Sequence, residues 1–250
     1  MPQLSVVIIT FNEDKNIARC LESVQGLADD IVVLDSFSTD KTESICKQFN
    51  VNFIQRKWEG YSASKNFANA QAKYDWILSL DADEAPSEEL KKSILKAKEG
   101  SELKTYKFHR LTNYCGSWIK HCGWYPDTKI RIFDRKITKW EGIIHEKLAI
   151  ASTEDAILLE GDLLHYSYYS IEQHYAQTEN FSTLAAQNMF EKGKKASAFK
   201  MYLSPVIKFI SDYFIKLGIL DGAAGYTICR ISAYHSYLKY KKLRALYSEN

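Results

Sequence analysis

The chain has 250 residues, of which 46% are hydrophobic and 26% charged, and its formal net charge is +2. Such a chain can bury a substantial core, and its composition excludes a disordered protein and a fibrous repeat. The five cysteines are scattered without a C-x-x-C pair, so we expect reduced thiols and a cytosolic compartment, not a zinc or redox site. The apolar residues 4–9 are too few for a signal peptide and predict a buried strand.

Strand and helix patterns alternate along the first eighty residues. Aliphatic and β-branched runs predict strands at 4–10, 30–34, 51–54 and 76–80. Helical spacing of apolar residues between these runs predicts helices at 17–24, 42–49 and 63–72. This βαβ alternation predicts an α/β fold, with a mainly parallel, Rossmann-like sheet that helices cover on both faces.

Polar clusters stand at the ends of three of these strands, at residues 10–13, 35–40 and 81–84. In parallel sheets, ligands bind outside the carboxyl ends of the strands, so we expect the three clusters to converge on one crevice. The alternative is that each cluster only caps the helix that follows it, as Asp and Ser often do. No G-x-G-x-x-G follows the first strand, which argues against a dinucleotide oxidoreductase.

Asp81 and Asp83 stand two apart after an apolar strand, so in an extended segment both carboxylates point to the same side. Together they suit a divalent cation, Mg²⁺ or Mn²⁺, which proteins bind through one or two carboxylates and the phosphates of a substrate. A nucleoside diphosphate is such a substrate, and the metal would stabilise it as a leaving group. Acidic pairs are also common in solvated turns, so the motif alone does not indicate a metal site. Its position at the end of a predicted buried strand is what favours one.

Shorter extended segments rich in aromatic residues follow between about residues 103 and 165. The aromatic side chains that stand out are Trp118, Trp124, Tyr125 and Trp140. Their flat faces can hold the sugar rings of an acceptor, or they can pack in the core. From residue 170 onwards the spacing is helical, and Gly218, Gly222 and Gly225 mark a turn between two helices.

Four blocks, taken in order, resemble those of family 2 glycosyltransferases. They are Ser5-Val-Val-Ile-Ile-Thr-Phe-Asn-Glu13, Asp35-x-x-Ser-x-Asp-x-Thr42, Gly60-Tyr-Ser-Ala-Ser-Lys-Asn66 and Trp76-Ile-Leu-Ser-Leu-Asp-Ala-Asp-Glu84. Three later segments resemble the bacterial lipopolysaccharide-core β-1,4-glucosyltransferase branch: Trp140-Glu-Gly-Ile-Ile-His-Glu146, Leu217-Gly-Ile-Leu-Asp-Gly222 and Lys239-Tyr-x-Lys-Leu243. The resemblance covers nearly the whole chain.

The resemblance implies a GT-A fold, with a nucleotide-sugar and acceptor domain at residues 1–168 and a helical extension at 169–250. It implies an inverting, metal-dependent transfer of a hexose from a nucleoside diphosphate sugar, UDP-glucose in that branch, to a lipid-linked glycan such as the lipopolysaccharide core. A polyprenol phosphate acceptor is the alternative within the family. A non-catalytic module that binds a nucleotide sugar or glycan is the alternative outside enzymes, and no nucleic-acid partner is expected.

The resemblance carries over onto the nucleoside-binding block at Thr10, Asn12 and Glu13, the base- or ribose-binding acid Asp35, the phosphate-facing Lys65, and the metal- and ribose-binding acids Asp81 and Asp83. These residue types suit their partners, because carboxylates accept hydrogen bonds from ribose hydroxyls and a lysine brings positive charge to a phosphate. For Lys65 the alternative is a solvated position on a helix.

An inverting transfer needs one base to take the proton of the acceptor hydroxyl, and we assign this role to Glu146. Its neighbour His145 faces the opposite way in an extended segment, so one side chain can meet the metal while the other meets the acceptor. We assign Trp140, in the same block, to substrate binding. Glu84 and Asp127 are the alternative bases, although Glu84 can instead cap the helix after it.

The end of the chain is basic and aromatic. From Lys192 onwards, eleven Lys and Arg residues stand against three acidic ones, which leaves the preceding part of the chain acidic. Apolar residues at intervals of three or four, with Lys208, Asp212 and Lys216 opposite them, predict an amphipathic helix over 202–220. It is too polar to span a bilayer. We expect it to lie on the anionic inner face of the cytoplasmic membrane, or to pack on its own domain.

Overall fold

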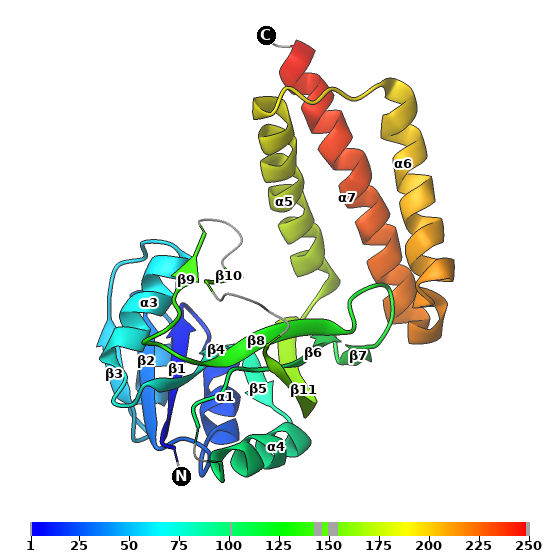
Figure 1. The fold of residues 1–250 in the computed structure, drawn as a ribbon. Coiled ribbons are helices and arrows are strands. Elements are labelled where there is room, and N and C mark those ends of the chain that lie inside the picture. Colours follow the sequence, from blue (N-terminus) through cyan, green and yellow to red (C-terminus); the bar gives the residue numbers. More distant parts are fainter. Residues whose placement is uncertain (1, 101, 143–146, 150–154, 249–250) are drawn as a thin grey trace. The chain divides into compact units, whose positions relative to one another are not determined.

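The computed structural model describes residues 2–100, 102–142, 147–149 and 155–248. It contains the four predicted strands, β1 (Leu4–Thr10), β2 (Asp30–Asp35), β3 (Asn52–Gln55) and β4 (Trp76–Asp81). The helices between them are α1 (Ile17–Ser23), α2 (Thr42–Cys46) and α3 (Tyr61–Gln71) (Figure 1). The strands pair in parallel in the order β3-β2-β1-β4, as the βαβ alternation predicts.

The sheet continues beyond β4 with antiparallel strands. After β5 (Glu84–Pro86) and helix α4 (Glu88–Lys98) come β6 (Tyr106–Tyr114), β7 (Ser117–Ile119), β8 (Asp127–Asp134) and β11 (Ile157–Tyr168). The order among the described strands is β3-β2-β1-β4-β8-β6-β11-β5, with β7 beside β6; β9 (Trp140–Glu141) and β10 (Lys147–Leu148) form a separate pair. The predicted α/β class, a sheet flanked by helices with a C-terminal helical part, is confirmed.

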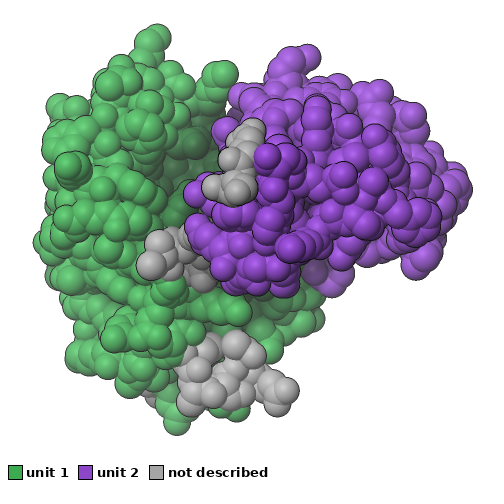
Figure 2. Space-filling view, turned by 90° about the horizontal axis from the view of Figure 1, so that it is seen from above, with its two compact units in different colours: residues 1–110, 127–165 green, residues 111–126, 166–250 purple. Residues whose placement is uncertain are grey.

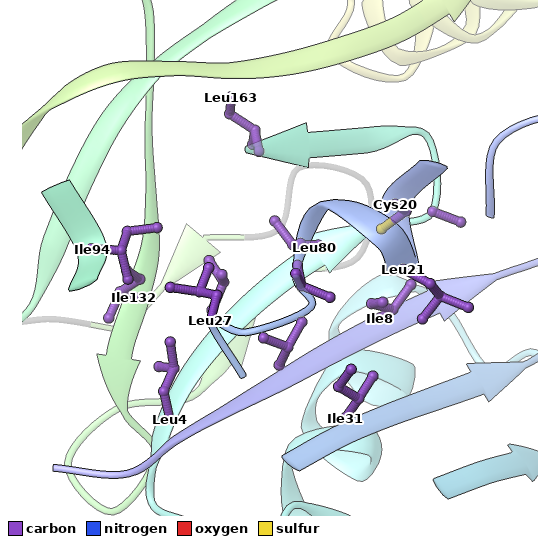
Figure 3. Close-up of a cluster of buried hydrophobic side chains, with 14 of the residues drawn as sticks. Leu4, Ile8, Cys20, Leu21, Leu27, Ile31, Leu80, Ile94, Ile132 and Leu163 are labelled. Carbon is purple, nitrogen blue, oxygen red and sulfur yellow. The ribbon is translucent and has the colours of Figure 1, made fainter. Parts of the chain in front are cut away.

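Strand β1 is buried along its whole length and contributes to two cores. Successive side chains of a strand point to opposite faces, so Val6 and Ile8 pack with α1 and α4 while Val7 and Ile9 pack with α3. Figure 3 shows the first of these cores, where Ile8 lies among side chains from α1, β2 and β4. Because both faces are covered, β1 carries an unbroken aliphatic run.

The internal contacts of the chain divide it into two compact units, which Figure 2 colours green and purple. Unit 1 consists of residues 1–110 and 127–165, and unit 2 of residues 111–126 and 166–250. In the structure, residues 111–126 belong to the same unit as the C-terminal helices. The sequence analysis placed them in the first domain, because it divided the chain once, after residue 168. That predicted division stays a prediction.

Long helices make up most of unit 2: α5 (Ile171–Glu191), α6 (Ala198–Ile210) and α7 (Gly222–Ser248). Helix α7 packs against both α5 and α6 (Figure 1). Ser170 and Gln173 form a capping box at the start of α5, and the Ser197 side chain caps α6. Among the described helices, none has the length and the apolar composition that crossing a bilayer requires.

The helix predicted over 202–220 ends earlier than expected. Helix α6 continues into a π-helical turn, η1 (Ser211–Ile215), and Leu217 then has a left-handed φ of 55°. A short 3₁₀ helix, η2 (Gly218–Asp221), leads into α7. A Cβ added to Gly225 would lie 2.0 Å from the Gly218 carbonyl oxygen, so this close approach requires glycine. The predicted turn at these glycines is confirmed.

A cluster of aromatic rings surrounds His174 in unit 2. The His174 ring centroid lies 4.6 Å from that of Tyr168 and 5.9 Å from that of Trp124, and its Nδ1 lies 3.1 Å from the Tyr114 hydroxyl. Trp124 therefore packs inside this unit, whereas Trp118 keeps 36% of its surface exposed. Burial, and after it the nearby His235, lower the pKa of His174 from 6.5 to about 4.

The stability of the protein should therefore fall as the pH is lowered from 6.5 to 4. In this pH window His174 is protonated in the unfolded state but stays neutral in the folded state. Protonation therefore stabilises the unfolded state, and the free energy of unfolding is lower than at neutral pH by about 3 kcal/mol. Urea denaturation at several pH values measures this loss. In His174→Gln, which cannot titrate, the pH dependence should be smaller by that amount, and His109→Gln serves as the control. Equal pH dependence in the wild type and His174→Gln would contradict the assignment.

Candidate active site

The three polar clusters at the strand ends lie along one edge of the parallel sheet. In the strand register Thr10 is the partner of Asp35, and Ile9 is the partner of Asp81. The N-caps of the helices that follow lie outside the clusters, at Asn16, Lys41 and Ser87. In the second cluster Asp40 accepts from the N–H of Thr42, the first residue of α2, at 2.9 Å, so the capping alternative holds there in part. It is wrong for Glu84, because the Ser87 hydroxyl caps α4.

The first two clusters hold each other in place. The Asn12 backbone N–H donates to the Ser38 hydroxyl at 2.8 Å, and the Asn12 side-chain oxygen accepts from the Thr39 N–H at 2.8 Å. Asp35 is fully buried and accepts from the Ser38 N–H at 2.9 Å and from the Gln55 amide at 3.1 Å. Asn12 and Asp35 thus shape the loops at this edge, and their predicted contacts with a nucleoside stay predictions.

Asp81 is part of a buried network of charges. Its carboxylate lies 3.1 Å from the Lys65 ammonium and 2.9 Å from the Arg131 guanidinium. Arg131 comes from β8 and also binds Glu84 at 2.6 Å, and Glu84 in turn accepts from the Asp81 backbone N–H at 3.0 Å. Burial alone would raise the pKa of Asp81, but the charges of Lys65 and Arg131 outweigh it and hold that pKa well below its usual range.

Lys65 is 1% exposed, so the alternative that it is a solvated helix residue is wrong. Its ammonium lies 4.7 Å from the centre of the Trp140 ring, within the range of a cation–π contact. The backbone of Trp140 is held by the Asn66 side chain. The Asn66 amide oxygen accepts from the Trp140 backbone N–H, and the Asn66 amide nitrogen donates to the Trp140 carbonyl. The ring is 6% exposed and packs on Phe133, and its predicted contact with substrate stays a prediction.

Asp83 lies apart from these pairs and beside a histidine. Its Oδ2 is 3.1 Å from Nε2 of His165, a residue of β11, and both side chains are partly exposed. Glu13 feels the charges of Asp83 and His165, and burial, with a further contribution from Asp83, raises the pKa of Glu13. Sequence analysis missed His165. Its one signal was a histidine in an otherwise extended run, and the antiparallel pairing of His165 with Glu84 brings it to the aspartate pair.

Several polar atoms at this edge are shielded from solvent and lack a hydrogen-bond partner among the described residues. They include the Thr10 hydroxyl and the Trp140 indole nitrogen. Both carboxylate oxygens of Asp81 are paired, one with the Lys65 ammonium at 3.1 Å and the other with the Arg131 guanidinium at 2.9 Å. Leaving a buried polar atom unsatisfied costs about 1–3 kcal/mol, so such atoms need an explanation.

The predicted base Glu146 and the predicted metal ligand His145 lie outside the described residues. Both alternative bases are engaged in ion pairs. Glu84 is fully buried against Arg131, and Asp127 lies 2.7 Å from Arg110 and 2.9 Å from Lys129. Burial raises the pKa of Asp127, but Lys129 and Arg110 outweigh it and lower that pKa, which makes Asp127 a weaker base.

Comparisons with known proteins place the chain in a family. The sequence model of glycosyl transferase family 2 matches residues 5–120. An uncharacterized glycosyltransferase of Rickettsia typhi is 32% identical over 257 residues, which span 98% of this chain and 88% of that protein. The chain belongs to glycosyltransferase family 2. Another relative of this glycosyltransferase is LpsC of Rhizobium meliloti, a lipopolysaccharide core biosynthesis glycosyltransferase, which is 26% identical over 96% of this chain and 91% of its own length.

A solved structure resembles this glycosyltransferase more distantly. It is glucosyl-3-phosphoglycerate synthase from Mycobacterium tuberculosis in complex with Mn²⁺, UDP and glucosyl-3-phosphoglycerate. The TM-score is 0.42 at 17% identity, over 54% of this chain and 58% of that one. At this TM-score the likeness does not bear on the donor or the metal of this chain.

The Arg131 network should be needed for folding. Arg131→Met leaves the buried Glu84 with only the longer contact to Arg110, at 3.4 Å, which should lower the free energy of unfolding by about 3 kcal/mol in urea denaturation. The double variant Arg131→Met/Glu84→Gln should recover part of this loss, because the uncompensated charge is gone. Lys136→Met removes an exposed ion pair with Asp75 and should leave the stability close to that of the wild type, because water screens exposed charges. An Arg131→Met protein as stable as the wild type would refute this role.

Proposed function

We propose that this family 2 glycosyltransferase transfers a hexose, with inversion, from a nucleoside diphosphate sugar to a lipid-linked glycan such as the lipopolysaccharide core. UDP-glucose, the donor implied by the resemblance to the core glucosyltransferase branch, is the first to test. The Thr10 hydroxyl and the Trp140 indole nitrogen, which lack a hydrogen-bond partner among the described residues, carry this proposal, because a hydroxyl-rich ligand at the strand ends would satisfy them. The relationship to LpsC supports the lipid-linked acceptor.

A divalent cation fits Asp83 and His165. Their facing oxygen and nitrogen are 3.1 Å apart, and adjacent ligands of an octahedral ion, each about 2.1 Å from it, stand about 3 Å apart. Among the described residues, no group of three or more His, Cys, Asp or Glu side chains is arranged to hold a metal. Two protein ligands leave positions for donor phosphates, as Mg²⁺ and Mn²⁺ sites often do. When bound, the metal would stabilise the charge of the departing diphosphate.

The other charged residues have distinct tasks in this proposal. Lys65 is buried beside Asp81 and supplies positive charge to the phosphate side of the site. Asp81 is ionised and is held between Lys65 and Arg131, where its carboxylate would meet a ribose hydroxyl or the metal. Glu146 takes the proton of the acceptor hydroxyl as the sugar carbon is attacked from the face opposite the diphosphate. The enzyme works as a peripheral protein at the cytoplasmic face of the inner membrane.

The metal assignment is tested by donor binding. In thermal-shift measurements with UDP, Mn²⁺ should raise the melting temperature of the wild type further, because a ligand of the folded state stabilises it. Asp83→Asn should abolish the Mn²⁺-dependent part and turnover, and His165→Ala should weaken metal binding by about tenfold or more. The exposed Asp155→Asn is the matched control. An unchanged Mn²⁺ response in both Asp83→Asn and His165→Ala would exclude this pair as the metal site.

The role of the base is tested separately. Glu146→Gln should bind the donor with unchanged affinity but lose transfer to the acceptor, because the amide cannot accept the proton. Binding is measured by thermal shift, and transfer by release of the nucleoside diphosphate. Normal transfer rates in Glu146→Gln would remove this assignment. If the wild type bound the nucleotide with metal but turned over no donor, the protein would be a binding module. Polyprenol phosphate as the better acceptor would select the other branch of the family.

A further inference from the structure

Helix α6 and the π-helical turn after it expose a set of large apolar side chains, which we call the docking face. Its members are each more than half exposed: Phe199, Tyr202, Val206, Ile207, Phe214 and Ile215. From one member to the next the interval is three, four, one, seven and one residues, so they cover a broad outward side of the helix and the turn. Soluble proteins rarely leave a contiguous apolar patch of this kind uncovered, and such patches mark interaction sites.

Helix α6 and the turn after it carry apolar side chains both inward, where Phe209 and Tyr213 pack on a buried cluster, and outward, where the docking face lies. Asp212 is 2% exposed, although it is the acidic residue of the predicted polar face. It lies between Lys208 and Lys216, whose ammonium groups stand 2.8 and 2.9 Å from its carboxylate oxygens. The charged stripe is thus partly buried and internally neutralised, while the docking face lies outward.

The charges around the docking face favour an anionic partner. Between residues 192 and 248, eleven basic residues stand against Asp212 and Asp221, and one of the eleven, Lys242, is paired with Glu179 of α5 at 2.8 Å. Both aspartates are engaged, because Asp221 accepts from the His121 backbone N–H at 2.8 Å and lies 2.9 Å from its Nδ1. Lys194, Lys195 and Lys200 are exposed before and within the first turn of α6. An exposed apolar side flanked by uncompensated lysines is the pattern of helices that lie in the interface of an anionic bilayer.

We infer that the docking face inserts into the interfacial layer of an anionic lipid bilayer, with α6 lying on the membrane and the lysines around residue 195 contacting lipid phosphates. The inference rests on the proposed function in one respect, since a lipid-linked acceptor would lie at such a surface. Apolar burial supplies the larger part of the binding, and the lysines supply a smaller part that salt screens.

The test is co-sedimentation of the full chain with vesicles of phosphatidylcholine, with and without phosphatidylglycerol. The wild type should bind the anionic vesicles, more weakly at high salt but still measurably, and should bind neutral vesicles less. Ile207→Ser/Ile215→Ser should lower the partition coefficient by at least about tenfold, because two buried apolar side chains are lost. Donor and acceptor are absent, so failure here is distinct from failure of the proposed transfer reaction.

A matched double variant serves as the control. Ile137 and Leu184 are 74% and 54% exposed, close to the 75% of Ile215 and the 57% of Ile207, but neither belongs to the docking face. Ile137→Ser/Leu184→Ser should bind vesicles like the wild type, and unchanged melting temperatures would show that all variants fold. Wild-type protein that ignores anionic vesicles at low salt would overturn the inference, as would equal binding by both double variants. The inference would also be overturned if the wild type were a dimer in sedimentation velocity, did not bind vesicles, and became a monomer in Ile207→Ser/Ile215→Ser.

Discussion

The burial of Glu84 beside the aspartate pair is the constraint on which the site depends. A carboxylate with no exposed surface is tolerated only with a cation against it, and Arg131 supplies this cation from the antiparallel strand β8. The same guanidinium binds Asp81, so the loop between β4 and β5 is tied to the neighbouring strand. With Asp81 held toward Lys65 and Arg131, Asp83 is left to face His165. The two aspartates thus have different surroundings although they stand two residues apart.

This arrangement is rigid where it is paired and incomplete where a ligand would bind. The strands beneath it are buried on both faces, and the loops that hold Asn12 and Asp35 are joined by side-chain to backbone hydrogen bonds. Against this ordered background, the Thr10 hydroxyl and the Trp140 indole nitrogen have no hydrogen-bond partner among the described residues, and leaving such buried atoms unsatisfied is costly. A site that keeps unsatisfied polar groups in fixed positions is prepared for a ligand, because little reorganisation is needed when the ligand arrives.

The helical unit also contains a buried carboxylate, Asp212, that is neutralised by nearby lysines. Lys208 and Lys216 neutralise Asp212 inside the unit, which allows α6 to turn the docking face outward. After η1 the chain turns through η2 into α7, and the close approach of Gly218 and Gly225 allows this turn to be tight. The polarity of the surface is therefore set by which face of an amphipathic helix the neighbouring helix covers. Neither periodicity nor composition specifies that choice.

The sequence by itself determined the local features of this protein. Unbroken aliphatic runs predicted β1 to β4, and their alternation with helices predicted the parallel order of strands and the edge where polar residues gather. Four ordered blocks predicted the family. Contacts between distant segments were decided only by the tertiary structure: the pairing of β11 with β5 that brings His165 to Asp83, the position of Arg131 on β8, and the inward face of α6. The physical reason is that periodicity and propensity act over a few neighbouring residues, whereas a buried charge selects its partner from whatever strand the fold places beside it.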